Sequence, residues 1–150
     1  MFSKEIKFNL EAKKKLLKGI NLVGDAVGCT LGPKGNCVVI GDIDKKPIVT
    51  KDGVTVAKHI ETKDLTENAG VQLIREAAET MLGSVGDATT TSTVMAQAMI
   101  NCCMNLIQKN KVHPIFLKQQ LEEQHVLVAN EFQKYVKTIK DSDILNIATI

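Results

Sequence analysis

No charged side chain occurs in residues 88–108, a run of 21 residues that begins with hydroxyl side chains and then becomes apolar. A helix of this length is nominally long enough to cross a bilayer. Four amide side chains nevertheless recur along it at helical spacing and place one polar stripe on the helix. They are Gln97, Asn101, Asn105 and Gln108. We therefore expect a helix of a soluble protein that its neighbours bury, and no membrane span.

The size and charge of the chain limit its class further. At 150 residues and 44% hydrophobic content, the chain is long enough for one core and too short for two comfortable domains. The net charge of +2 creates no overall field that would attract nucleic acid or an anionic membrane. Charges near the N-terminus exclude a signal peptide there, and the bias of a transit peptide is absent, so we expect a cytoplasmic protein.

The four cysteines indicate neither a zinc site nor a disulfide framework. Cys29, Cys37, Cys102 and Cys103 lack the paired C-x-x-C spacing, and two of them are adjacent. We expect buried, reduced thiols and a reducing compartment.

Apolar periodicity predicts two long helices besides the uncharged one. The first covers roughly residues 10–29, and the second runs from Thr66 to Gly83. The apolar stripe of the first is Leu16, Ile20, Val23 and Val27, and that of the second is Ala69, Leu73, Ala77 and Met81.

The remaining segments are shorter or less regular. Residues 37–40 and 47–50 are β-prone and predict a hairpin, and residues 54–60 predict a short helix. Pro114 suits a first helical position. The apolar face that follows it is Leu117, Leu121, Val128 and Phe132. A last helical segment begins at Asp141, so the expected fold is mainly α with one small β-hairpin.

Three glycine corners carry the residues suited to chemistry: "TLGPKG" at 30–35, "KDG" at 51–53 and "GDATTT" at 86–91. A helix is expected directly after the second and third corners. Unpaired N–H groups and the positive end of the helix dipole hold phosphate oxygens at a helix start, and threonine hydroxyls add donors. Asp87 suits a Mg²⁺ ligand, since Mg²⁺ in nucleotide sites is held by one or two carboxylates plus phosphates.

Structural explanations of the same residues remain open. Asp87 would serve equally as a helix N-cap, although three consecutive threonines exceed what one cap needs. Asp52 could be a turn residue before Gly53, and Lys34 a solvated loop charge. The chain contains no G-x-x-x-x-G-K-[ST] motif, which excludes an ordinary P-loop. His59, His113 and His125 are isolated, and we expect surface or capping roles for them.

Together these stretches resemble the N-terminal part of the group I chaperonin family, the branch of GroEL and mitochondrial Hsp60. The matching stretches are "GINLVGDAVGCTLGPKGNCVVI", "PIVTKDGVTVAKHIE", "GDATTTSTVMAQAMI" and the closing "IATI". The resemblance implies a mainly helical equatorial domain that binds ATP with Mg²⁺ and K⁺ and forms homo-oligomeric rings, usually of seven subunits. Residues 1–136 would be the N-terminal half of that domain, and residues 137–150 the start of the intermediate domain.

The resemblance also assigns roles to single residues. It implies that Asp52 is a carboxylate near the γ-phosphate that assists hydrolysis, and that Asp87, Thr30 and Lys51 belong to the metal sites, with Asp87 on Mg²⁺. The implied nucleotide-binding set is Thr30, Leu31, Gly32, Pro33, Lys51, Asp52, Gly53, Asp87, Ala88, Thr89, Thr90, Thr91 and Ile150.

Three departures from the family pattern qualify the resemblance. Ala88 replaces the second glycine of Gly-Asp-Gly and adds a Cβ where the backbone approaches phosphate, so we expect weaker ATP turnover. His113-Pro114 is more similar to group II and indicates a divergent member. Family members are several times longer, so we expect a fragment that would hydrolyse ATP poorly alone. The client-binding domain, the co-chaperonin contacts and the carboxylate that activates water would then lie outside it.

The resemblance thus implies a subunit of an ATP-dependent protein-folding chaperonin, a foldase ATPase that acts on unfolded client proteins. Two alternatives stay open. One is a stand-alone helical interaction module that associates with chaperonin rings without hydrolysing ATP. The other is an unrelated nucleotide-binding enzyme that uses the same loop chemistry.

Overall fold

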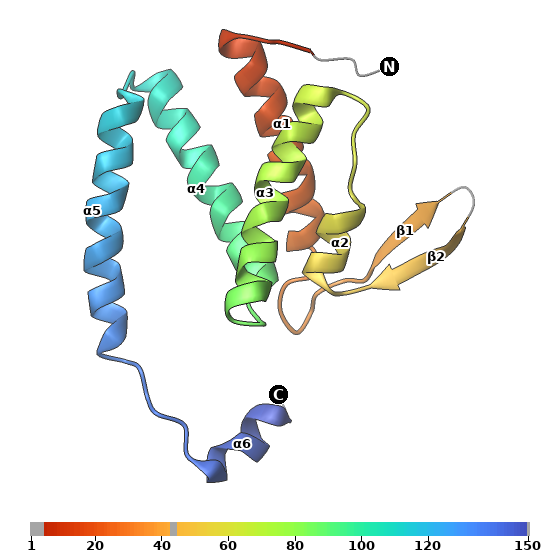
Figure 1. The fold of residues 1–150 in the computed structure, drawn as a ribbon, viewed down its shortest axis with the longest axis vertical. Coiled ribbons are helices and arrows are strands. Elements are labelled where there is room, and N and C mark those ends of the chain that lie inside the picture. The colour runs from red at the N-terminus through yellow and green to blue at the C-terminus, as the bar shows by residue number, and fades with distance from the viewer. Residues whose placement is uncertain (1–4, 43–44, 150) are drawn as a thin grey trace. The chain divides into compact units, whose positions relative to one another are not determined.

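The structure, a computed structural model, describes residues 5–42 and 45–149 and divides the chain into two compact units, Met1–Met104 and Asn105–Ile150. The described part is mainly helical with one two-stranded antiparallel sheet, which confirms the expected fold class (Figure 1). The elements are α1 (Asn9–Gly28), β1 (Val38–Asp42), β2 (Lys45–Thr50), α2 (Gly53–His59), α3 (Leu65–Ser84), α4 (Thr89–Lys109), α5 (Pro114–Gln133) and α6 (Asp141–Ala148).

Helix α1 supplies one side of the core of the first unit. Ile20, Val23 and Val27 are buried, as the apolar stripe predicted, while Leu16 is half-buried. Val56 and Ala57 of α2 and Val71 and Ile74 of α3 complete the buried cluster. Burial of such side chains contributes about 1.5–3 kcal/mol each, so this cluster holds α1, α2 and α3 together.

Two glycines let α1 and α3 approach each other backbone to backbone. A Cβ at Gly19 would overlap the carbonyl oxygen of Glu67, and a Cβ at Gly70 would overlap that of Leu16. Both glycines are buried. Any side chain at either position would force the two helices apart.

The predicted core face of α3 is wrong by about one residue. Ala69 and Leu73 are exposed, and Ala77 and Met81 are only half-buried. The buried residues are Gly70, Val71, Ile74 and Ala78. Two adjacent stripes of α3 are apolar, and the close approach at Gly70 decides which of them faces α1.

Helix α3 begins one residue earlier than the expected Thr66, because Asp64 caps it. The Asp64 carboxylate accepts hydrogen bonds from the N–H groups of Thr66 (2.9 Å) and Glu67 (3.1 Å). It also pairs with the ammonium of Lys15 on α1. The pKa of Asp64 is held well below its usual value. The Lys15 ammonium has the largest effect, and the two capping N–H groups add to it.

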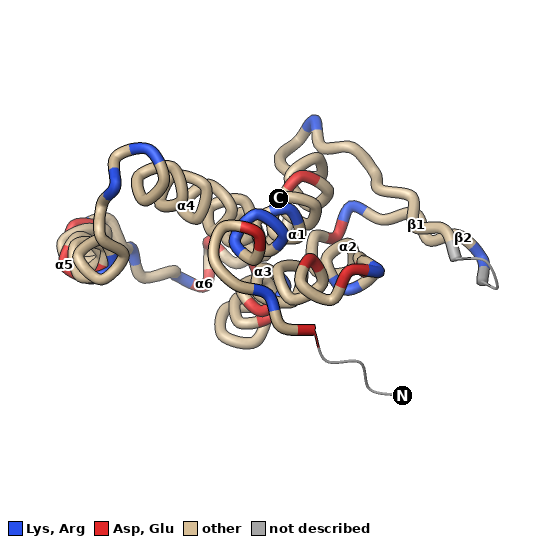
Figure 2. The backbone as a smooth tube through the Cα atoms, turned by 90° about the horizontal axis from the view of Figure 1, so that it is seen from above, with Lys and Arg blue, Asp and Glu red and all other residues tan. Residues whose placement is uncertain are grey.

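The uncharged helix α4 is present, but the expectation that its neighbours bury it is wrong within the described residues. Thr93 is its only buried residue, and Met95 is 58% exposed. Figure 2 shows the tube of α4 without charge along its length except at its end. No described helix is both long and apolar enough to cross a membrane.

The polar stripe of α4 packs partly against α1 through hydrogen bonds. The amide nitrogen of Gln97 donates to Asp25 (2.7 Å) and to the side-chain oxygen of Asn21 (3.2 Å). Asn101 donates to the same Asn21 oxygen at 2.8 Å. Gly24 leaves room for this contact, since a Cβ there would overlap the Gln97 side chain.

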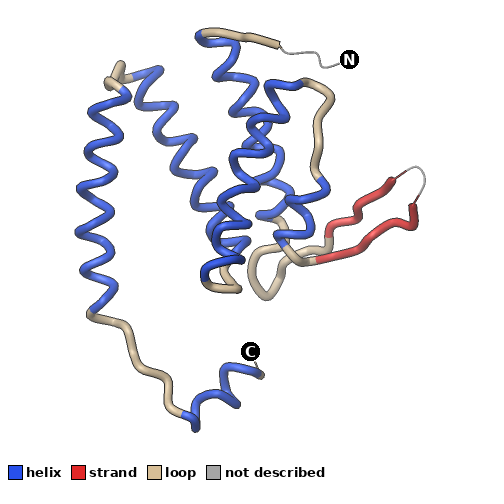
Figure 3. The backbone as a smooth tube through the Cα atoms, in the orientation of Figure 1, coloured by secondary structure: helices blue, strands red, loops and turns tan. Residues whose placement is uncertain are grey.

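Strands β1 and β2 form the predicted hairpin, which extends away from the packed helices (Figure 3). Val39 pairs with Val49, and both are exposed. Helix α2 follows directly and buries Val54, Val56 and Ala57, so the hairpin leads into the core through α2.

In the second unit, Pro114 occupies the first turn of α5 as predicted, and His113 caps the helix by accepting from the N–H of Ile115 (3.3 Å). This confirms the expected capping role of His113. No described residue of α5 is buried. Helix α6 begins at Asp141 as expected. The predicted domain boundary at 136/137 falls in the segment between α5 and α6 and stays a prediction.

The expectation of buried thiols is wrong. Cys29, Cys37 and Cys102 are exposed, Cys103 is half-buried, and all four are free. Cys29 follows the last residue of α1, and Cys102 lies on α4, whose cover in this chain is slight.

The substitution Gly70→Ala tests the close approach of α1 and α3. The added methyl group overlaps the α1 backbone, which cannot move as a flexible side chain does. We expect the free energy of unfolding to fall by about 1–3 kcal/mol, the usual effect of overpacking. Urea unfolding followed by circular dichroism measures it.

Gly83→Ala in the same helix is the matched control, because nothing lies within 4 Å of a Cβ at that position. Alanine has the higher helix propensity, so this variant should be neutral or up to about 1 kcal/mol more stable. Equal effects of the two substitutions would contradict the proposed contact.

Candidate functional site

The loop after α1 is closed by its own backbone hydrogen bonds. The N–H of Gly35 donates to the carbonyl of Gly32 (2.9 Å), and that of Asn36 to the carbonyl of Cys29 (2.8 Å). Gly32 has a φ of +77°, in the left-handed region that favours glycine. A Cβ at Gly35 would overlap the carbonyl oxygen of Thr30. The loop therefore needs both glycines to hold this conformation.

Thr30 is buried at the base of this loop, and its hydroxyl donates to the carbonyl of Val27 at 2.7 Å. The hydroxyl proton is thereby committed to the end of α1. The lone pairs of the oxygen remain available as acceptors or as ligands of a cation.

A four-residue connection joins α3 to α4 and bends twice. Gly86 lies two residues after the end of α3 and has a φ of +79°, and its N–H donates to the carbonyls of Leu82 (3.1 Å) and Met81 (3.2 Å). Ala88, directly before α4, has a φ of +62°. Asp87 lies between the two and is exposed, and its carboxylate accepts from the N–H of Ala88 at 2.6 Å.

The start of α4 divides its hydroxyl groups into two sets. Ser92 and Thr93 donate to the carbonyl of Thr89, at 2.9 Å and 2.8 Å, and so stabilise the first turn. The backbone N–H groups and hydroxyls of Thr89, Thr90 and Thr91 form no hydrogen bond with any other described residue. This turn therefore presents a cluster of unpaired donors.

The two loops meet in a pocket of about 200 Å³. Thr30, Leu31 and Gly32 line one side, and the turn from Asp87 to Thr91 lines the other. Eight of the thirteen residues predicted for the nucleotide site thus line one pocket. The lining is rich in N–H and hydroxyl donors and contains the single carboxylate of Asp87, a set that suits an anion with a bound cation.

The second corner, "KDG" at 51–53, reaches this site through Gly53. A Cβ at Gly53 would overlap the hydroxyl oxygen of Thr90 and crowd Val27, so the first turn of α2 packs directly against the first turn of α4. A larger residue at position 53 would have to displace the Thr90 side chain. The "KDG" corner therefore lies beside the threonine turn, although it does not line the pocket.

Asp52 is the N-cap of α2. One of its carboxylate oxygens, Oδ2, accepts from the N–H of Thr55 (2.9 Å) and from the Thr55 hydroxyl. The hydrogen bond from the Thr55 hydroxyl lowers the pKa of Asp52 most, and burial opposes it. The backbone N–H groups of Thr55 and Val54 and the charge of Lys58 lower the pKa further. The other oxygen, Oδ1, has no hydrogen-bond partner among the described residues.

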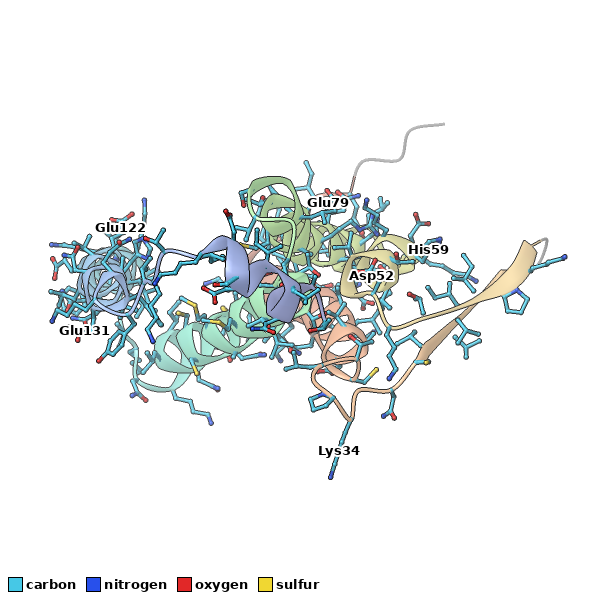
Figure 4. All side chains as sticks on the ribbon, turned by 90° about the horizontal axis from the view of Figure 1, so that it is seen from below. Lys34, Asp52, His59, Glu79, Glu122 and Glu131 are labelled. Atoms are coloured by element: carbon cyan, nitrogen blue, oxygen red, sulfur yellow. The ribbon has the colours of Figure 1, made fainter. Side chains whose placement is uncertain are left out.

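Two further predicted residues, Pro33 and Lys51, lie outside the pocket lining. Pro33 follows the lining residues in the first loop and is exposed, as is Lys51 beside Asp52. Ile150 lies outside the described residues. Lys34 extends away from its loop, as a solvated charge would (Figure 4). Within residues 5–42 and 45–149, no group of three His, Cys, Asp or Glu side chains gathers around a possible metal.

Two sets of supporting residues escaped the sequence reasoning. The Gln97–Asn21–Asp25 hydrogen bonds join the helices that carry the two sides of the pocket. The polar stripe of α4 was visible in the sequence, but its partner was not. Arg75 of α3 binds two backbone carbonyls at the end of α2. The one feature of the sequence that could have drawn attention to Arg75 is that it is the only arginine in the chain.

This arrangement occurs in a chain that matches the model of the TCP-1/cpn60 chaperonin family over residues 23–150. The match covers most of the chain, and the protein therefore belongs to that family. A relative is "Chaperonin GroEL 3" of Psychromonas ingrahamii, to which the chain is 50% identical over 123 residues. These findings confirm the resemblance to the GroEL branch. The aligned segment makes up 82% of this chain and 22% of that chaperonin, so this chain spans about a fifth of the relative's length.

The conformation of Ala88 leads to a test of backbone strain in the site. A left-handed φ disfavours a residue with a Cβ by roughly 1–2 kcal/mol, while glycine loses more conformational entropy on folding. We expect Ala88→Gly to stabilise the protein by up to about 1 kcal/mol, measured by urea unfolding.

Ala98→Gly provides a control of opposite sign, because Ala98 is an exposed residue inside α4. Glycine there should destabilise the protein by about 1 kcal/mol. A loss of stability in Ala88→Gly that matches the control would mean that Ala88 carries no strain.

Proposed function

We propose that this chain is the ATP-binding part of a chaperonin subunit whose ATP turnover drives the folding of client proteins. The observation that carries the proposal is the pocket in which the unpaired donors of Thr89, Thr90 and Thr91 face the loop of Thr30 to Gly32. Phosphate groups are the anions that such a helix start binds best. Membership in the chaperonin family supports ATP as the phosphate-bearing ligand.

The size of the pocket supports binding of the phosphate end of the nucleotide. Pockets that enclose a complete small ligand measure about 300–1,000 Å³, and this one measures about 200 Å³. Its lining contains donors and two apolar side chains, those of Leu31 and Ala88, and no aromatic residue that would cover an adenine ring. We infer that the remainder of the nucleotide contacts other parts of the complete protein.

Asp87 is proposed as the protein ligand of Mg²⁺. It is exposed at the pocket and is the only acidic residue in its lining. Mg²⁺ typically keeps several waters and takes one or two carboxylates plus phosphate oxygens. When bound, the ion neutralises charge on the phosphates. Thr30 and Lys51 are proposed to contribute to a K⁺ site. The free lone pairs of the Thr30 hydroxyl suit that role, and Lys51 would contribute its backbone carbonyl, because its ammonium has no lone pair.

Asp52 is proposed to orient the water that attacks the γ-phosphate. Like an ordinary aspartate it is ionised at neutral pH, and its lowered pKa makes it a weaker general base, since a good base has a pKa near the working pH. Its role is therefore positioning and polarisation of the water. The capping and catalytic explanations are compatible, because Oδ2 serves the cap while Oδ1 has no described partner.

The wider functions belong to the same proposal. They comprise assembly into homo-oligomeric rings, seven subunits per ring, contact with a co-chaperonin, capture of unfolded clients, and a cytoplasmic location. Membership in the chaperonin family and the similarity to the GroEL relative support them. The stand-alone interaction module remains the alternative that the binding experiment below separates from this proposal.

The first test removes the metal ligand. We expect Asp87→Ala in the complete protein to weaken Mg²⁺-ATP binding by about 10-fold or more, since even residues that only orient a metal ligand contribute 10- to 100-fold. Isothermal titration with Mg²⁺-ATP measures the affinity. Glu79→Ala, which removes an exposed carboxylate of α3 outside the pocket, should bind normally. Unchanged affinity in Asp87→Ala would exclude Asp87 as the ligand, and absence of ATP binding in the unaltered protein would favour the interaction module.

The second test separates the cap from the chemistry at Asp52. Asparagine is as good an N-cap as aspartate, so Asp52→Asn should keep the melting temperature and the ATP affinity. Loss of the charge should slow single-turnover hydrolysis by about 10- to 1000-fold, the scale of one positioned acid–base or electrostatic group. A normal rate of hydrolysis in Asp52→Asn would leave Asp52 with the capping role alone.

A further inference from the structure

The C-terminal end of α2 is held by Arg75 of α3. The guanidinium Nε donates to the carbonyl of Ala57 at 3.1 Å, and Nη2 donates to the carbonyl of Ile60 at 2.8 Å. The last carbonyls of a helix have no partners within the helix. Nδ1 of His59 lies 2.8 Å from the carbonyl of Thr55 and binds a further carbonyl of the same helix. Besides the core packing of Val56 and Ala57, Arg75 therefore links this end of α2 to α3 by hydrogen bonds.

The residue type at position 75 suits this contact. Arg75 is the only arginine among the 19 basic residues of the chain, and the others are lysines. A planar guanidinium presents several donors in a rigid fork, so it binds two carbonyls at once in a fixed geometry. A lysine ammonium is a flexible point charge and would hold the two carbonyls less rigidly. Arg75 is half-buried, which limits competition from water.

The opposite end of α2 carries the catalytic candidate. Asp52 caps this end, and Gly53 packs against the hydroxyl of Thr90. Figure 4 labels Asp52 and His59, the residues at the two ends of the helix. A helix of seven residues is only about 10 Å long at 1.5 Å per residue. A shift at its C-terminal end therefore moves Asp52 as well, since so short a helix behaves as a rigid rod.

We propose that Arg75 is a positioning residue for ATP hydrolysis, which acts by holding α2 and thereby the carboxylate of Asp52. This inference rests on the proposed role of Asp52 in hydrolysis. Arg75 itself touches no residue of the pocket lining among its hydrogen bonds, so its loss affects the chemical step and leaves the phosphate-binding donors in place. A displacement of the order of 1 Å at a reacting group slows an enzymatic step by as much as about 100-fold.

The test is a double-mutant cycle in the complete protein, with single-turnover ATP hydrolysis and ATP affinity measured side by side. Arg75→Met should slow hydrolysis by about 10- to 100-fold and leave the affinity unchanged. Arg75→Lys keeps the charge and some donors, so its rate of hydrolysis should lie between those of the unaltered protein and Arg75→Met. In the Asp52→Asn background, Arg75→Met should add little, because residues that act as one unit are not additive. Lys63→Met, which removes an exposed charge between α2 and α3, is the control and should hydrolyse ATP normally.

The outcomes separate the two proposals. If Asp52→Asn slows hydrolysis and Arg75→Met does not, the role of Arg75 is wrong while that of Asp52 stands. The role of Arg75 is also wrong if Arg75→Met slows hydrolysis by an equal factor in the unaltered protein and in the Asp52→Asn background. Arg75 would then act independently of Asp52. If Asp52→Asn has no effect, the proposed role of Asp52 fails and the positioning role of Arg75 fails with it. Should Arg75→Met not fold, as shown by circular dichroism, Arg75→Lys completes the same cycle.

Discussion

The close backbone contact between α1 and α3 is the constraint on which the rest of the first unit depends. Gly19 and Gly70 remove the side chains that would separate the two helices, and Val23, Val27, Val71 and Ile74 then pack around the crossing. Helix α2 joins the same core through Val56 and Ala57. The loop after α1 begins where that helix ends, and the corner at 51–53 leads from β2 into α2, so the packing of these helices fixes the positions of both.

The candidate site is built from loops that separate helices hold in place. Hydrogen bonds of Gln97 with Asn21 and Asp25 join α4 to α1, and the contact of Gly53 with Thr90 joins α4 to α2. The pocket lining itself has few internal bonds, and its donors at the start of α4 are unpaired. Such an arrangement places the stabilising interactions behind the site and leaves the groups in front of it available for a ligand.

Several residues of the site serve structure and chemistry with different atoms. The Thr30 hydroxyl gives its proton to Val27 and keeps its lone pairs. Asp52 uses Oδ2 as a helix cap and leaves Oδ1 without a described partner. Ser92 and Thr93 stabilise the turn of α4 that Thr89, Thr90 and Thr91 leave unpaired. A cap and a ligand-binding residue are therefore not exclusive alternatives, because one side chain has enough polar atoms for both.

The sequence by itself determined the helices, the hairpin and the identity of the glycine corners, because periodicity, capping and glycine conformation are local properties. It also singled out the eight residues that line the pocket, from Thr30 to Gly32 and from Asp87 to Thr91. Only the tertiary structure decided which apolar stripe of α3 is buried, that Thr93 alone among the described residues of α4 is fully buried, and that Arg75 holds α2. These three outcomes depend on how closely two helices approach and on which backbone groups lack a partner. The spacing of residues along one segment encodes neither of these two properties.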